Sequence, residues 1–252
     1  MLNNQTTDKL VQMKLPAMAD SYQRLMENPD SQAMTFDELF GMAVDAEWTS
    51  RQNKRFKRLI KQAEMKMTAC IEDLNYDPRR KLDKQLIIRL AEGTWIAKNN
   101  NLLITGKTGV GKSYLACAMG TMACRRNYTV KYYRLPRLLT DLNISKQEAD
   151  YNRILTSLKK CTLLILDDFG LSQISHDDSR DILEVVEERM NFGATLITSQ
   201  LPVSEWYNIF EDPTHADAIL DRIVHNSYTI EIEGPSMREV LSRKNRAENM
   251  DD

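Results

Sequence analysis

The stretch NLLITGKTGVGKSYLACAMG, residues 101–120, decides the fold of this chain. Its residues 106–113, GKTGVGKS, fit the pattern G-x-x-x-x-G-K-[ST] of a phosphate-binding loop. An apolar run over residues 102–105 predicts a strand before the loop, and residues 113–124 predict a helix after it. The motif requires this strand–loop–helix context, so the match predicts a P-loop nucleotide site.

Each residue type in the loop has a chemical reason. Glycines let backbone amides close around a phosphate, and the following helix N-terminus adds favourable partial charge. Lys112 would reach the β- and γ-phosphates of ATP, and Ser113 would ligate Mg²⁺. The residues expected to bind the nucleotide are Gly106, Lys107, Thr108, Gly109, Val110, Gly111, Lys112, Ser113 and Tyr114.

A second element, TLLILDDFG at residues 162–170, places two acids after a buried strand. In a parallel sheet, the ligand crevice lies at the carboxyl ends of the strands. We expect Asp167 to hold the magnesium ion and Asp168 to polarise the attacking water. Two surface acids at a helix start are the plain alternative, which the upstream P-loop disfavours.

Two further elements carry candidate catalytic residues. The strand ATLITSQ, residues 194–200, should bring its polar end, with Gln200, next to the two aspartates. In ILDRIVHNSYTIEI, Arg222 lies in a predicted helix and could stabilise transition-state charge on a neighbouring subunit's nucleotide. The alternatives are an ordinary strand end and a solvated pair of Asp221 with Arg222.

The pattern of apolar and polar residues changes near residue 80. Residues 8–75 contain one glycine and read as helices, with a break at Pro16 and a capping box formed by Thr35 and Glu38. The later residues alternate short apolar runs with helical stretches, which predicts a parallel sheet covered by helices on both faces. We therefore expect a helical N-terminal domain over residues 1–78 and an α/β nucleotide-binding domain over residues 79–252.

Taken together, the motifs GKTGVGKS, LLILDDFG, LITSQ and LDRI resemble those of the IstB-like and DnaC-like branch of the AAA+ ATPases, over nearly the whole chain. The resemblance is closest to the IstB-like proteins, which are ATPase helpers of transposition. It implies an αβα core with a five-stranded parallel sheet, preceded by a small all-α domain. It also implies assembly on duplex DNA as an ATP-bridged homo-oligomer, beside a cognate DDE transposase. Too few residues follow the LDRI motif for a helical lid.

The resemblance also assigns roles within the site. It matches Asp167 to the magnesium-associated Walker B acid and Asp168 to the residue that activates water. Gln200 falls at the sensor position, where the family often has Asn, and Arg222 falls at the arginine finger. The shorter carboxylate of Asp168, where many AAA+ enzymes have Glu, is consistent with slow ATP hydrolysis.

Contact with DNA must be argued locally because the net charge is −2. Residues 51–61, RQNKRFKRLIK, hold six cations and no acid, and residues 114–140 also lack acids. A solvated helix face is the alternative interpretation of the first cluster. No base-reading motif is present, so we expect sequence-independent binding to phosphates. The candidate DNA-binding residues are Arg51, Lys54, Arg55, Arg58, Lys131, Arg134 and Arg137.

Other features exclude some classes of protein. The four cysteines form no CxxC pair, and His176, His215 and His225 form no metal-binding motif. The N-terminus lacks a signal pattern, and no apolar run approaches a membrane span, so we expect a cytoplasmic protein. A regulator of a transposase is the favoured function. A DnaC-like loader of a replicative helicase is the alternative, and a small-molecule P-loop kinase is third.

Overall fold

The computed structural model describes residues 2–240 and 242. Its contacts divide the chain into two compact units, residues 1–58 and residues 59–252. The division lies inside the helix α3 (Phe36–Ala63), earlier than the boundary predicted after residue 78. The segment between these two positions belongs to the second unit because it packs there: the short helix η2 (Ile71–Asp73) contacts the helix that follows the P-loop.

The first unit is entirely helical. It contains α1 (Leu2–Gln12), α2 (Pro16–Glu27), the 3₁₀ helix η1 (Pro29–Ala33) and the first part of α3. Pro16 begins α2 at a position where its missing N–H costs nothing, so the predicted break is confirmed.

The predicted capping box at the start of α3 is also confirmed. The backbone N–H of Thr35 donates to Glu38 Oε2 over 2.7 Å, and the N–H of Glu38 donates to Thr35 Oγ1 over 3.3 Å. Further along α3, Glu47 Oε2 accepts the backbone N–H groups of Ala17 (2.9 Å) and Met18 (3.2 Å). A carboxylate at a helix N-terminus is stabilising, so Glu47 ties α2 to α3.

The second unit is built on a five-stranded parallel sheet in the order β2-β3-β4-β1-β5. The predicted fold class is confirmed. Each apolar run that alternated with a helical stretch forms a strand in the structure. The strands are β1 (Asn101–Thr105), β2 (Val130–Arg134), β3 (Leu163–Phe169), β4 (Ala194–Ser199) and β5 (Ser227–Glu231).

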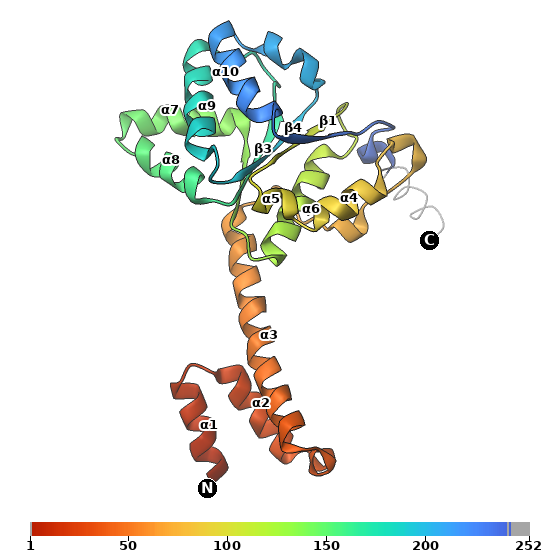
Figure 1. Ribbon diagram of the computed structural model, residues 1–252, viewed down its shortest axis with the longest axis vertical. Coiled ribbons are helices and arrows are strands. Elements are labelled where there is room, and N and C mark those ends of the chain that lie inside the picture. The colour runs from red at the N-terminus through yellow and green to blue at the C-terminus, as the bar shows by residue number, and fades with distance from the viewer. Residues whose placement is uncertain (1, 241, 243–252) are drawn as a thin grey trace. The chain divides into compact units, whose positions relative to one another are not determined.

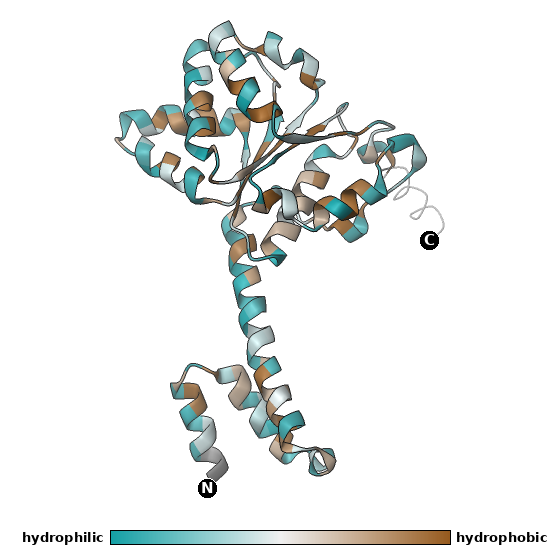
Figure 2. Cartoon of the chain, viewed as in Figure 1, coloured by the Kyte–Doolittle hydropathy of each residue, from teal (hydrophilic) through white to brown (hydrophobic). Residues whose placement is uncertain are grey.

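Helices cover the two faces of this sheet (Figure 1). On one face, α6 contacts β1, β2, β3 and β4. On the other face, strand residues such as Leu103 and Ile197 join one buried cluster with the helices α7 to α10. In Figure 2 these helices alternate hydrophobic and hydrophilic residues, as helices with one buried side do. The elements of this unit not yet placed are η3 (Pro78–Arg80), α4 (Lys84–Ala91), α5 (Thr94–Ala97), α6 (Lys112–Arg125), α7 (Leu135–Gln147), α8 (Tyr151–Lys160), α9 (His176–Arg189), η4 (Val203–Ile209) and α10 (Pro213–Val224).

The segment after β5 packs against the P-loop. The backbone N–H of Met237 donates to the carbonyl oxygen of Gly109 over 2.8 Å. The expected absence of a helical lid also concerns residues 241 and 243–252, which lie outside the described residues. None of the described helices has the length and apolar character needed to span a bilayer.

Candidate ATP site

The loop predicted to hold phosphate lies between β1 and α6, at the carboxyl edge of the sheet. Two of its glycines combine a positive φ with a close neighbour. Gly106 has φ +142°, and a Cβ there would lie 2.1 Å from the carbonyl oxygen of Ile232. Gly111 has φ +101°, and a Cβ there would lie 2.9 Å from Arg80 Nη2. The loop conformation therefore requires glycine at both positions.

Lys112 begins α6, and its side chain folds back over the loop. Its Nζ donates to the carbonyl oxygens of Gly106 (2.7 Å) and Lys107 (2.9 Å). Burial lowers the pKa of Lys112, while the negative charges of Asp167 and Asp168 act in the opposite direction. The ammonium group is thus held inside the loop and close to two carboxylates.

Asp167 is fully buried at the end of β3. Its carboxylate accepts hydrogen bonds from Ser113 Oγ (2.9 and 2.8 Å to the two oxygens), from the Tyr132 hydroxyl (2.5 Å) and from Thr198 Oγ1. Burial alone would raise the pKa of Asp167, but the hydrogen bonds from Thr198, Tyr132 and Ser113, with the Lys66 charge, lower it overall. The structure therefore keeps this carboxylate ionised.

Asp168 has an unusual backbone. Its φ is +64°, and the pairing of β3 with β4 shifts register between Leu166 and Phe169. A non-glycine residue in this region costs about 1–3 kcal/mol and is often found at functional sites. The N–H of Asp168 donates to Thr198 Oγ1 over 3.2 Å, and its Oδ2 accepts from Arg134 Nε over 2.7 Å.

The polar end of β4 lies next to both aspartates, as predicted, because Thr198 bonds to each of them. Gln200 is exposed, and its Oε1 accepts the hydroxyl of Thr108 in the P-loop over 2.6 Å. The structure thus places Gln200, which directly follows β4, next to the P-loop.

Lys66 is a site residue that the sequence did not indicate. Its Nζ lies 3.2 Å from Asp167 Oδ2 and 3.5 Å from Ser113 Oγ, between the two residues predicted to hold magnesium. It follows α3 by a few residues and stands in a region rich in lysine and arginine, so no local pattern distinguishes it.

Arg80 was missed for a similar reason, because it lies among other charged residues beside the predicted domain boundary. The side chain is buried; Nη2 donates to the carbonyl oxygen of Val110 over 2.8 Å, and Nη1 donates to the carbonyl oxygen of Asn75. Burial lowers the pKa of Arg80. Arg80 thus stabilises the P-loop through its hydrogen bond to Val110.

Arg222 lies on α10 and is held within its own chain. Its Nη2 donates to Glu187 Oε1 on α9 over 2.9 Å, and its Nη1 donates to the carbonyl oxygen of Ala218 over 2.8 Å. The ion-pair partner of Arg222 is thus Glu187 on the neighbouring helix, and a solvated pair of Asp221 with Arg222 stays an alternative interpretation. The arginine-finger role stays a prediction.

The first set of predicted DNA contacts lies together on α3. Arg51, Lys54, Arg55 and Arg58 are all exposed on that helix. Arg51 also has a structural role, since its Nε donates to Glu47 Oε1 over 2.7 Å and its Nη2 to the carbonyl oxygen of Lys14 over 2.8 Å.

The second set is not gathered on one surface. Lys131 and Arg134 are three residues apart on β2, so their side chains leave opposite faces of the sheet. Arg134 is paired with Asp168, and Arg137 is exposed on α7. The structure therefore links one predicted DNA contact directly to a predicted catalytic carboxylate.

Comparison with known proteins agrees with this geometry. The family description "IstB-like ATP binding protein" matches residues 8–247. The chain belongs to this family of IstB-like ATP-binding proteins. With its P-loop, this IstB-like chain binds ATP and is an ATPase.

The relatives of this IstB-like chain are insertion-sequence proteins by name. An insertion sequence ATP-binding protein of Sinorhizobium fredii (strain NBRC 101917 / NGR234) is 41% identical over 97% of this chain and 100% of its own length. The ATP-binding protein of insertion sequence IS1162 from Pseudomonas fluorescens is 43% identical over 81% of this chain and 89% of its own length.

Among solved structures, the crystal structure of DnaI is 26% identical, with a TM-score of 0.59 over 71% of this chain and 98% of that chain. The DnaC helicase loader is 18% identical, with a TM-score of 0.53 over 59% of this chain and 87% of that chain. The second likeness shows a shared fold.

Proposed function

We propose that this ATPase assembles on duplex DNA in its ATP-bound form and assists the DDE transposase of an insertion sequence. The observation that carries the proposal is that each aspartate at the edge of the sheet pairs with a cationic side chain. Arg134 bonds to Asp168, and Lys66 bonds to Asp167. Relatives that cover nearly the whole chain are named as insertion-sequence proteins, which supports the transposition context.

Ser113 and Asp167 fit a magnesium ion. Mg²⁺ takes oxygen ligands, and the Ser113 hydroxyl lies 2.8 Å from an ionised, buried carboxylate oxygen. A cationic group already lies beside both, since the Lys66 ammonium contacts each of them. When bound with ATP, Mg²⁺ neutralises phosphate charge and orients the γ-phosphate.

The protein's own groups would then act as follows. Lys112 would leave the loop carbonyl oxygens and donate to the β- and γ-phosphates, while backbone amides of residues 106–114 would surround them. Asp168 would orient the attacking water once it has separated from Arg134. Gln200, which contacts the P-loop through Thr108, would bond to the γ-phosphate or the water.

Arg134 links DNA to this chemistry. While its guanidinium pairs with Asp168, that carboxylate is not available to water. A DNA phosphate that drew the exposed guanidinium away would free Asp168. We therefore expect DNA to stimulate ATP hydrolysis and expect Arg134→Ala to hydrolyse ATP without needing DNA.

Assembly and partner choice are tested with the full chain. We expect sedimentation with ATP and duplex DNA to show large particles that neither ligand alone produces. We expect a DDE transposase of an insertion sequence, rather than a hexameric replicative helicase, to co-purify with those particles. Capture of the helicase alone would support the loader function, and monomers under all conditions would contradict assembly.

A further inference from the structure

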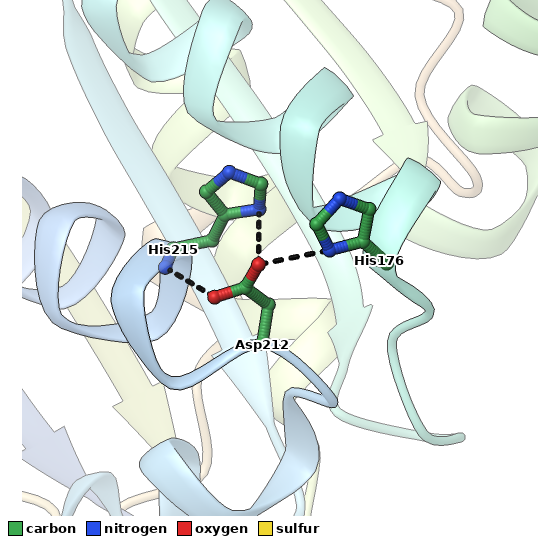
Figure 3. Close-up of side chains that lie close together, drawn as sticks. All are labelled: His176, Asp212 and His215. Atoms are coloured by element: carbon green, nitrogen blue, oxygen red, sulfur yellow. Dashed lines mark hydrogen bonds and ion pairs between the residues drawn. The ribbon is translucent and has the colours of Figure 1, made fainter.

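Two histidines far apart in the sequence lie on either side of one carboxylate in the ATPase unit (Figure 3). Asp212 Oδ2 is 2.8 Å from His176 Nδ1 and 3.5 Å from His215 Nδ1. The two imidazole rings are stacked, with centroids 5.1 Å apart. The absence of a histidine motif in the sequence is therefore misleading, because the fold assembles the group.

The backbone fixes this arrangement. Ile174 and Phe210 form an isolated parallel bridge, in which the Ile174 N–H donates to the Ile209 carbonyl oxygen over 2.8 Å. Two residues beyond the bridge on each segment stand His176, which begins α9, and Asp212, which caps α10. The bridge thus sets the two side chains opposite each other.

Asp212 is itself held in place. Its Oδ1 accepts the backbone N–H groups of Thr214 (2.8 Å) and His215 (3.2 Å) at the start of α10, which leaves Oδ2 facing the two rings. His215 follows one helical turn later on the same side of α10. The anchors of all three side chains are therefore rigid elements, and α9 packs against α10.

We propose that His176, Asp212 and His215 bind a late first-row divalent cation, with Zn²⁺ as the best fit. Two imidazole nitrogens and one carboxylate oxygen suit this class of metal, and a water molecule would complete a tetrahedron. Bond lengths of 2.0–2.2 Å imply ligand atoms about 3.3 Å apart, and the two observed distances of 2.8 and 3.5 Å lie on either side of that value. Mg²⁺ prefers oxygen-only ligands, so this site differs chemically from the ATP site.

The surroundings set the affinity. Ser179 Oγ lies 2.8 Å from His215 Nδ1 and donates to the His176 carbonyl oxygen, so binding must replace one hydrogen bond. Arg180 Nη2 lies 3.4 Å from His176 Nε2 and opposes a nearby cation. Both features predict moderate rather than tight binding, and they predict that removal of the Arg180 charge strengthens it.

The test is a titration of the metal-free full chain with ZnCl₂, and with CoCl₂ as an optical probe, in excess Mg²⁺. We expect one ion per chain and a rise in the unfolding temperature. The Co²⁺ spectrum should lack thiolate charge-transfer bands, which excludes the four free cysteines. His176→Ala, His215→Ala and Asp212→Asn should each weaken binding by at least about tenfold, while Arg180→Ala should strengthen it.

The matched control is His225→Ala, which removes the third histidine and should leave the affinity unchanged. Asn also caps helices, so Asp212→Asn separates loss of a ligand from loss of α10 stability. Absence of binding by the unmodified chain, or equal affinity in the His176→Ala and His225→Ala variants, would overturn the proposal.

Discussion

Asp167 shows how neighbouring side chains can keep a buried carboxylate ionised. Three hydroxyl groups donate to its carboxylate, and the Lys66 ammonium also donates and adds a positive charge. Hydrogen bonds and a cation stabilise the ionised form, which outweighs the cost of burial. A carboxylate ligand for a divalent cation must be ionised, so the same contacts would suit Asp167 to the Mg²⁺ ion proposed above.

Lys112→Ala should abolish tight ATP binding without unfolding the chain. The substitution removes the ammonium that meets the β- and γ-phosphates, and charged hydrogen bonds of this kind are worth about 1.5–3 kcal/mol, or about 10- to 100-fold in affinity. Fluorescent-nucleotide titration measures the loss, and circular dichroism checks the fold. Lys98→Ala, at the end of α5, is the control. Unchanged nucleotide affinity and turnover would rule out the P-loop assignment.

Lys66→Met should lower the Mg²⁺ concentration needed for half-maximal ATP binding. The Lys66 ammonium lies between Ser113 and Asp167 and competes with the ion for the same oxygen atoms. Loss of this partly exposed pair is worth about 1 kcal/mol at most, so we expect a change of up to about fivefold. A Mg²⁺ titration at fixed nucleotide measures it, with Lys61→Met as control. If both variants need as much Mg²⁺ as the unmodified chain, Lys66 does not compete.

At the scale of elements, the strands and the loop could be predicted because their signals are local. Each apolar run is a stretch of neighbouring residues, Gly106 and Gly111 belong to one short loop, and the two acids stand side by side at the end of β3. Lys66, Arg80 and the pair of His176 with His215 could not be predicted, since each gains its partners only through contacts between distant segments. The chain shows no alternation or spacing that marks such partners.

The boundary between the two units, which falls inside α3, could not be predicted for the same reason. A run of helix-forming residues predicts a helix, but it does not say to which unit each turn belongs. Residues 64–78 mix polar and apolar residues without a clear period, and they belong to the ATPase unit, where Ala69 and Leu74 are buried. Their placement depends on packing, which is not local information.

Arg55→Glu with Arg58→Glu should weaken binding to all duplex sequences alike. Each lost phosphate contact reduces the salt slope by about 0.9, so the double variant should flatten it by about two. Titration of several duplexes at varied salt concentration measures both quantities. Lys98→Glu with Lys160→Glu makes the same change of charge at exposed positions outside α3 and should have a smaller effect. Equal effects of the two double variants would mean that net charge, rather than this face, determines binding.

At the scale of the whole molecule, the packing of α9 against α10 determines whether the Arg222 guanidinium is available to a neighbouring subunit. Glu187 holds the guanidinium within its own chain. A pair this exposed contributes at most about 1 kcal/mol, so a neighbouring subunit's nucleotide could take the arginine from Glu187 at little cost. Assembly would then exchange an internal ion pair for one between subunits, and this exchange would couple oligomerisation to ATP hydrolysis.

Two inactive variants, Arg222→Ala and Asp168→Asn, can test whether Arg222 acts on the nucleotide of a neighbouring subunit. Loss of an arginine finger costs about 10³-fold or more in turnover, while ATP binding should survive because the P-loop is unchanged. Glu187→Gln, which releases Arg222 without removing it, is the control and should stay active. In a mixed assembly, about a quarter of head-to-tail interfaces would pair an intact Asp168 with an intact Arg222 from the next subunit. We therefore expect ATP hydrolysis to return in part when the two variants are mixed with DNA. If cross-linking shows mixed assemblies that remain as inactive as their components, Arg222 does not act on a neighbour's nucleotide, and ATP would drive assembly through binding alone.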